Sequence, residues 1–311
     1  MYDAIVVGGG VAGLSAGLML GRARRRVLLL DAGEPRNASA AAAHGVFTRD
    51  GTPPLELLRL AREQLRPYAT VELRSEAAVA ALAVDGGFEV ELADGERARG
   101  RKLLLATGVR DELPAIPGFA ELWGGSVFTC PYCHGWEMRD EPLAVYANGA
   151  VAMHAAPLLR NWSRDVVLLT DGPAELTAEE RAKLAALEIP VREERVARLV
   201  GAAAGAPGGG ERRLECVVFV GGEELRRRGI LMRPGQRPRT ELAVGLGCGL
   251  KEDGPMAGLI VVDATQQTTV PGVFAAGDLV GMPQVNIAAA SGSTAGAMLN
   301  AALIAEEVAA A

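Results

Sequence analysis

The sequence predicts an α/β fold built in two parts, with a second domain inserted into a first. A glycine-rich turn follows a short apolar strand near the N-terminus, and a second strand–helix–strand pattern begins at residue 143. The 311 residues are enough for about two domains. The chain is 49% hydrophobic and contains 39 glycines, which fits sizeable cores joined by many tight turns.

The first pattern begins with the strand Ala4–Val7, a short apolar run typical of a buried parallel strand. The turn 8–13 that follows has the form G-x-G-x-x-G. We expect a helix over 14–22 and a second strand over 27–30, directly before Asp31. This order is typical of a Rossmann-like dinucleotide-binding domain, whereas the glycine motif alone also fits an unrelated α/β turn.

The residues of this turn have separate expected roles. Gly8 permits the tight turn, Gly10 lets a pyrophosphate approach the backbone, and Gly13 lets the helix pack closely on the strand. The pyrophosphate would lie on the helix N-terminus, where free N–H groups favour anions, and Asp31 can accept hydrogen bonds from a ribose. The residues expected to bind the dinucleotide here are Gly8, Gly10, Val11, Ala12, Gly13, Asp31 and Ala32.

The remaining elements follow in order. After a loop-like segment over 31–52 we expect a helix over 53–66 and strands over 71–73, 79–84, 88–92 and 101–106. The second pattern predicts strands over 143–146, 165–169, 192–200 and 213–220, helices over 151–161 and 177–187, and a flexible glycine-rich stretch over 201–210. Strands over 259–263 and 273–276 and a helix over 285–309 end the chain. We assign residues 1–114 and 242–311 to the first domain and 115–241 to the inserted one.

Two cysteines separated by two residues, Cys130 and Cys133, lie in the inserted part, and His134 follows at once. Haem attachment shares this form but requires export, and zinc requires four ligands, for which no second pair is suitably spaced. An inert disulfide is the third alternative. We expect no metal, and the pattern favours redox exchange of the two thiols. The isolated Cys216 and Cys248 are expected to be packing residues.

Thiol–disulfide exchange requires an ionised thiol and a group that moves protons. His134 is the expected base, because an imidazole titrates near pH 6.5 and can take a proton from a dithiol and return it. His154, on an expected helix, and His44, in a loop, are the alternatives. Each of these two is more simply explained as an ordinary surface or core residue.

Charge and hydropathy limit the partners. The net charge of −6 argues against nucleic acid, which binds clustered cations. Apolar stretches are interrupted before the ~20 residues that a bilayer requires, so we expect no membrane span. The chain leads directly into a strand from Tyr2, so we expect no leader and a cytoplasmic location.

Nearly the whole chain resembles the thioredoxin reductase-like branch of the two-dinucleotide-domain flavoproteins. The resemblance is carried by Gly8-x-Gly10-x-x-Gly13, Ala106-Thr107-Gly108, Cys130-x-x-Cys133 and Gly277-Asp278 followed by Gln284-Val285. It implies FAD, a homodimer, and a flavin-facing disulfide in which Cys130 is the exchanging cysteine and Cys133 contacts the flavin. It also implies cofactor contacts from Thr107, Gly108, Gly277, Asp278, Gln284 and Val285.

The sequence departs from that family pattern at three places. Ala147 replaces the first glycine of the second dinucleotide fingerprint, although Gly149 remains. Asp171 lies where NADPH-dependent members place arginines, and it would repel a 2′-phosphate, although NADH remains conceivable. His134 replaces the usual aspartate. Together these departures resemble the gliotoxin- and holomycin-type dithiol oxidases.

Three functions are therefore compared. The first is an FAD-dependent oxidase that converts a small dithiol to its disulfide and passes the electrons to oxygen without NADPH. The second is a thioredoxin reductase-like enzyme that ferredoxin, or NAD(P)H in an unusual mode, reduces, and that acts on a thioredoxin-like protein. The third is a non-catalytic flavoprotein scaffold, which would need neither the two thiols nor His134.

Overall fold

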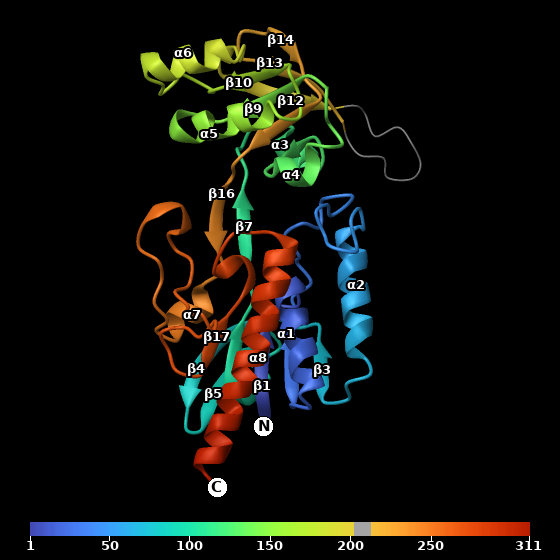
Figure 1. Ribbon diagram of the computed structural model, residues 1–311, viewed down its shortest axis with the longest axis vertical. Coiled ribbons are helices and arrows are strands. Elements are labelled where there is room, and N and C mark those ends of the chain that lie inside the picture. Colours follow the sequence, from blue (N-terminus) through green and yellow to red (C-terminus); the bar gives the residue numbers. More distant parts are fainter. Residues whose placement is uncertain (202–212) are drawn as a thin grey trace.

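The first sheet, in the lower half of Figure 1, has short apolar strands at its centre. The computed structural model describes residues 1–201 and 213–311, so the glycine-rich stretch expected to be flexible lies, apart from Gly201, outside the described residues. The parallel strands are, in sheet order, β3 (Val71–Arg74), β2 (Val27–Leu30), β1 (Tyr2–Val7), β6 (Arg97–Leu105) and β17 (Val273–Ala275). The first half of β6 pairs antiparallel with β5 (Gly87–Leu92), which pairs with β4 (Ala78–Val84).

Three helices cover this sheet: α1 (Val11–Arg22), α2 (Pro54–Leu65) and α8 (Val285–Ala309). Small residues let α1 and α8 approach closely, since a Cβ added to Gly292 would lie 2.1 Å from the Ala12 carbonyl oxygen. By length and composition, α8 could cross a membrane, so the expectation that no apolar stretch is long enough is wrong. In the fold, α8 packs against α1 and buries Ala295, Leu299 and Leu303, as the core helix of a globular protein does.

The second sheet is parallel and lies above the first in Figure 1. Its strands, in order, are β11 (Val191–Arg192), β10 (Val166–Leu169), β9 (Leu143–Tyr146), β15 (Gly229–Met232) and β8 (Val127–Phe128). The neighbouring antiparallel strands are β12 (Val196–Gly201), β13 (Leu214–Phe219) and β14 (Glu224–Arg226). The helices are α3 (Phe119–Leu122), α4 (Pro131–His134), α5 (Gly149–Leu159) and α6 (Ala178–Ala186).

A two-stranded antiparallel ribbon joins the two sheets (Figure 1). It consists of β7 (Val109–Glu112) and β16 (Gly235–Pro238). Short helical turns follow at α7 (Glu241–Gly245), η1 (Gly254–Met256) and η2 (Gly277–Leu279). The α/β class expected from the sequence is confirmed, whereas the domain division after residues 114 and 241 stays a prediction.

Two expected strands are wrong. The run 192–200 is interrupted between β11 and β12, because β12 turns to pair antiparallel with β13 and the Val196 N–H donates to Asp171 Oδ1 at 2.7 Å. The run 259–263 forms only isolated bridges, because the Ile260 N–H donates to the Leu279 carbonyl rather than to a neighbouring strand. Cys216 and Cys248 are buried, as expected of packing residues.

Candidate active site

A cavity of about 720 Å³ lies where the two parts of the molecule meet. Its walls come from the glycine turn, the segment after β2, the end of β6, α4, η2 and the start of α8. All predicted site residues except Gly13 line it, namely Gly8, Gly10, Val11, Ala12, Asp31, Ala32, Thr107, Gly108, Cys130, Cys133, His134, Gly277, Asp278, Gln284 and Val285. The fold therefore brings the expected cofactor residues and the cysteine motif into one space.

The glycine turn has the geometry that its sequence predicts. Gly8 has φ +112°, and a Cβ there would lie 2.2 Å from the Ala106 carbonyl oxygen. A Cβ on Gly13 would lie 1.8 Å from the Gly8 carbonyl oxygen, so Gly13 shapes the turn from behind. Gly10 has no neighbour within 4 Å of its Cβ position, and as the N-cap of α1 it offers no side-chain cap. The first N–H groups of α1 therefore remain available to an anion in the cavity.

The acid after β2 is fixed in place. Asp31 accepts a hydrogen bond from the Gly33 N–H at 3.1 Å and forms an ion pair with Arg62, whose Nη2 lies 2.5 Å from its carboxylate. The ion pair leaves the carboxylate able to accept further hydrogen bonds, because each of its two oxygens has two lone pairs. A ribose hydroxyl is the expected donor.

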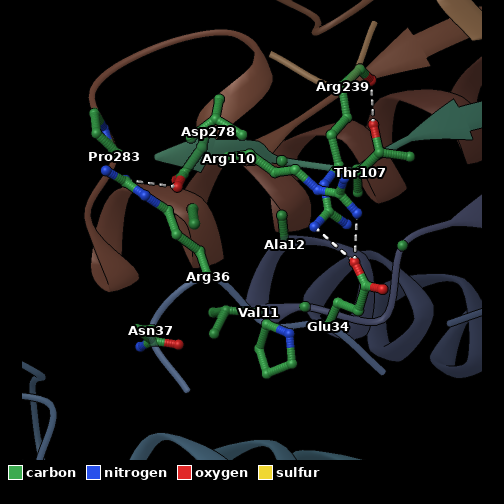
Figure 2. Close-up of a pocket in the computed structure, with 18 of the residues that line it drawn as sticks. Val11, Ala12, Glu34, Arg36, Asn37, Thr107, Arg110, Arg239, Asp278 and Pro283 are labelled. Atoms are coloured by element: carbon green, nitrogen blue, oxygen red, sulfur yellow. Dashed lines mark hydrogen bonds and ion pairs between the residues drawn. The ribbon is translucent and has the colours of Figure 1, made fainter. Parts of the chain in front are cut away.

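Arg36 connects two acids that line the cavity, and Figure 2 shows its contact with one of them, Asp278. Its guanidinium donates to both carboxylate oxygens of Asp111, at 2.7 and 2.8 Å, and to Asp278 Oδ2 at 3.2 Å. Burial raises the pKa of Asp278, and the positive charge of Arg36 opposes that rise. Arg36 therefore ties β7 to the η2 turn, on which the cofactor contacts of Gly277 and Asp278 are expected.

A second ion-pair group holds the ribbon (Figure 2). Glu34 Oε2 accepts from Arg110 Nη2 at 2.8 Å and from Arg239 Nη2 at 3.0 Å, and Arg110 lowers the pKa of Glu34. Thr107 Oγ1 donates to the Arg239 carbonyl at 2.7 Å. The two segments that connect the sheets, β7 with Arg110 and β16 with Arg239 directly after it, are thus both ion-paired to Glu34 of the first part, beside the cavity.

The cysteine pair lies on α4, where Cys130 is the N-cap and Pro131 occupies the first turn. Both cysteines are free thiols in the structure and partly buried. A hydrogen bond from the Cys133 thiol, together with the backbone N–H groups of Cys133 and Tyr132, lowers the pKa of Cys130 to about 7. That hydrogen bond and burial raise the pKa of Cys133. Cys130 is therefore the thiol that ionises near neutral pH.

The His134 ring stacks on Phe128, with centroids 5.6 Å apart and planes 20° from parallel. Its Nε2 lies 3.2 Å from the Gly124 carbonyl oxygen. A carbonyl can only accept, so Nε2 donates in this contact. His154 is exposed on α5 and does not line the cavity, so the fold does not bring this alternative base to the thiols.

His44 does line the cavity. Its Nδ1 lies 3.4 Å from Asp50 Oδ2, and its Nε2 lies 3.5 Å from Glu137 Oε1. Glu137 follows α4, so this contact joins the 31–52 loop to the segment that carries the cysteines.

A model of the pyridine nucleotide-disulphide oxidoreductase family matches residues 2–292. The chain belongs to this family. Thioredoxin reductase tcpT of Claviceps purpurea is 34% identical over 315 residues, covering 98% of this chain and 95% of the relative. Thioredoxin reductase aclD of Aspergillus oryzae is 33% identical and covers 89% and 88%, respectively. The crystal structure of HlmI superposes with a TM-score of 0.90 at 39% identity, covering 99% of this chain and 94% of that one.

These likenesses confirm the thioredoxin reductase-like fold and the oxidoreductase class, and the cofactor of this disulphide oxidoreductase is FAD. The cavity fits it. The uncapped start of α1 and the open face of Gly10 suit the pyrophosphate, and Asp31 suits the adenosine ribose. The start of α8, where Gln284 Oε1 accepts from the Ile287 N–H at 3.2 Å, lies at the same cavity as the cysteines.

At the second dinucleotide site, side chains of the protein already occupy the hydrogen-bonding groups that would bind a nucleotide. Asn148 Oδ1 accepts from the Gly149 N–H at 2.9 Å and from the Glu175 N–H at 2.8 Å. The N-terminus of α5, where a second pyrophosphate would bind, is thus capped by an amide, unlike that of α1. Asp171, in the position of a ribose acceptor, accepts from the Tyr146 hydroxyl at 2.7 Å and from the Val196 N–H.

The sequence did not identify Glu34, Arg36, Arg110, Asp111 and Arg239 as site residues, yet all five line the cavity. One available signal was the pair of charges Glu34 and Arg36, which follow the second strand in a segment otherwise short of charge until Arg49. Their partners lie 75 or more residues away, so no local pattern indicates the pairs.

Proposed function

We propose that the protein is an FAD-dependent dithiol oxidase that works without a nicotinamide nucleotide. One contrast carries the proposal. At the first dinucleotide site the N-terminus of α1 has no side-chain cap. At the second site Asn148 caps the N-terminus of α5, and the carboxylate of Asp171 accepts a hydrogen bond from the Tyr146 hydroxyl. Electrons then have to enter from the thiol side, where Cys130 and Cys133 line the FAD cavity.

The proposed reaction begins with the Cys130–Cys133 disulfide. One substrate thiolate attacks Cys130 Sγ, forms a mixed disulfide and releases Cys133 as a thiolate. The second substrate thiolate attacks the substrate sulfur of the mixed disulfide, which closes the substrate disulfide and releases Cys130. The low pKa of Cys130 favours this second step, because a less basic thiolate leaves faster.

His134 is the proposed proton acceptor for the substrate thiols, since it lines the cavity beside both cysteines. FAD, held by the glycine turn, Asp31 and the start of α8, would supply the two-electron acceptor for the reduced cysteine pair, and oxygen is the proposed final acceptor. The overall change is one dithiol and one O₂ converted to one disulfide and one H₂O₂. Atoms and electrons balance without another reductant.

Aerobic turnover tests the proposal. With dithiothreitol and no nucleotide, oxygen uptake and peroxide formation should match in a ratio of one to one, and Cys133→Ser should abolish both while FAD stays bound. Uptake that persists in Cys133→Ser would contradict the cysteine route.

The second candidate is a thioredoxin reductase-like enzyme, favoured by the names of the tcpT and aclD relatives. In that case reduced ferredoxin or a nicotinamide nucleotide would drive reduction of a thioredoxin-like protein. A coupled assay with reduced ferredoxin, NADH and NADPH as separate donors distinguishes the two directions of electron flow.

The family resemblance also leads us to propose a homodimer in the cytoplasm. Sedimentation velocity of the FAD-loaded protein tests the first point, and a monomer at micromolar concentration would contradict it. Fractionation of the producing cells tests the second.

A further inference from the structure

The proposed reaction moves two protons, and the His134 ring can take up only one of them. Oxidation of a dithiol to its disulfide releases two electrons and two protons, and reduction of O₂ to H₂O₂ takes up the same number. A neutral imidazole accepts a single proton. A second group is therefore needed, which carries a proton out of the cavity while the thiols are oxidised and back into it when oxygen is reduced.

His44 is the other histidine of the cavity. Of the three histidines in the chain, His44 and His134 line it. Four acids that also line the cavity are ion-paired to arginines, namely Asp31, Glu34, Asp111 and Asp278. A carboxylate in such a pair must give up its cation to take a proton, and an ordinary carboxyl group holds a proton poorly at neutral pH. An imidazole gains and loses a proton more readily there.

Contacts on two sides hold His44 between the first part of the molecule and the segment that carries the cysteines. Asn286 Nδ2 donates to the Gly45 carbonyl at 2.6 Å, so the loop of His44 is tied to the start of α8. On the other side, His44 Nε2 lies 3.5 Å from Oε1 of Glu137, in the segment that follows α4. The ring therefore lies where the cofactor residues and the cysteine segment come together.

Asp50 orients the ring. Its Oδ1 accepts from the Gly45 N–H at 2.6 Å, and its Oδ2 lies 3.4 Å from His44 Nδ1. The Gly45 N–H and the His44 ring lower the pKa of Asp50, so this acid is a carboxylate at neutral pH. A carboxylate beside Nδ1 fixes the orientation of an imidazole and leaves Nε2 as the nitrogen that exchanges protons.

The two acids connect His44 to water. The His44 side chain is 23% exposed, whereas those of Asp50 and Glu137 are 67% and 43% exposed. A proton that reaches Nε2 from the cavity can pass to the Glu137 carboxylate and from there to solvent. While the ring carries the proton it is positively charged, and a carboxylate beside each nitrogen stabilises that charge.

Two cations lie close to these acids in the sequence. Arg49 precedes Asp50 and is exposed, and the Arg139 guanidinium lies 4.3 Å from the centre of the Trp136 ring and donates to its backbone carbonyl. Within residues 1–201 and 213–311, neither arginine is ion-paired to Asp50 or Glu137. Both carboxylates therefore remain available to the imidazole.

We propose that His44 is a second proton carrier of the reaction, which exchanges protons between the cavity and solvent through Glu137, with Asp50 as its orienting partner. The inference rests on the dithiol oxidation in the proposed function and assigns a further residue to it. Only S–H, N–H and O–H bonds form and break in this step, and no electrons pass through the ring.

The test follows the anaerobic half of the reaction in the FAD-loaded protein by stopped flow. Dithiothreitol is added in weak buffer, flavin absorbance reports electron transfer, and phenol red reports proton release. His44→Gln keeps a polar side chain but cannot carry a proton at neutral pH, so it should lower both rates by about tenfold or more. Added imidazole should restore most of the lost rate, because a free base replaces the missing one. Glu137→Gln should lower both rates by a smaller factor.

His154→Gln is the matched control. It makes the same change in a histidine that is exposed on α5 and does not line the cavity, so both rates should stay at the wild-type value. Flavin absorbance and Tm of each variant check that it is loaded and folded.

The outcomes separate the inference from the proposed function. Wild-type rates in His44→Gln would overturn the inference. Lowered rates that imidazole does not restore would also overturn it, since His44 would then only hold the two segments together. If the expected effects are found but the wild-type protein takes up no oxygen, the oxidase function is overturned and the inference stands. A wild-type flavin that dithiothreitol does not bleach would overturn both.

Discussion

Removing the thiol of Cys133 should make Cys130 less acidic. The pKa of Cys130 falls from an ordinary value of 9.0 to about 7, and the largest cause is the hydrogen bond from the Cys133 side chain. Cys133→Ala removes this donor, whereas Cys133→Ser keeps a hydroxyl donor in its place. The backbone N–H groups that also face the Cys130 sulfur remain in both variants, so most rather than all of the lowering should be lost in the alanine variant.

The size of the effect follows from the two pKa values. At pH 6 a thiol with a pKa near 7 is about 10% ionised and one near 9 is about 0.1% ionised, a ratio of about 100. The more basic thiolate is intrinsically more nucleophilic by about 6- to 10-fold, which offsets part of this ratio. These values are the limit in which all of the lowering is lost, so the alkylation rate of Cys130 at pH 6 should be lower in Cys133→Ala than in Cys133→Ser by up to about tenfold.

The assay is anaerobic alkylation by iodoacetamide across pH 5.5–10, with the modified residue identified by mass spectrometry. Below the pKa the thiol is protonated and unreactive, so the rate should rise through pH 7 in Cys133→Ser and at higher pH in Cys133→Ala. Burial raises the pKa of both Cys216 and Cys248, which makes them internal controls that stay unmodified at pH 6. Identical pH midpoints in the two variants would refute the assignment of Cys133 as the donor.

Three further predictions concern His134, Arg36 and Asp171. His134→Ala should lower dithiol turnover at neutral pH by about 10²–10⁴-fold and recover partly at higher pH, where the substrate thiol ionises unaided, while His154→Ala keeps its rate. Arg36→Ala should lower Tm and FAD retention, measured by thermal unfolding and flavin release, because it leaves the partly buried carboxylate of Asp278 without its cation; Arg36→Lys should restore part of both. Asp171→Asn should leave dithiol turnover unchanged, and a loss of turnover would show that the second dinucleotide site takes part in the reaction.

Local patterns were enough to predict the elements that carry the first dinucleotide site. The strand, glycine turn, helix and second strand up to Asp31 all form in the expected order, although β1 begins two residues and α1 three residues earlier than expected. α8 begins at Val285 and ends at Ala309 as expected. These features depend on side chains within a few residues of one another, so the sequence states them directly.

The ribbon between the sheets could not be predicted in this way. β16 has the sequence Gly-Gln-Arg-Pro, which has little preference for strand, and it forms because its partner β7 lies alongside. The short strands β8 and β15 likewise depend on each other and on β9. Pairing between distant segments decides such elements, and local propensity does not.

The same limit applies to the site. The predicted contacts line the cavity because the glycine turn, the end of β6 and the start of α8 lie at one end of one sheet, as expected of this fold. The sequence indicated a weakened second site from Ala147 and Asp171, but not that Asn148 caps the helix or that Tyr146 engages Asp171. Those contacts depend on side-chain positions that only the folded chain fixes.

The most direct test of the central claim is an anaerobic titration of the FAD-loaded protein, followed by absorbance at the flavin maximum. Dithiothreitol should bleach the flavin with one dithiol per FAD once the cysteine disulfide is reduced, and admission of air should restore the absorbance with formation of peroxide. NADPH and NADH at micromolar concentration should bleach it very slowly or not at all, because Asn148 and Tyr146 engage the groups that would bind them. Rapid bleaching by either nucleotide would contradict the account.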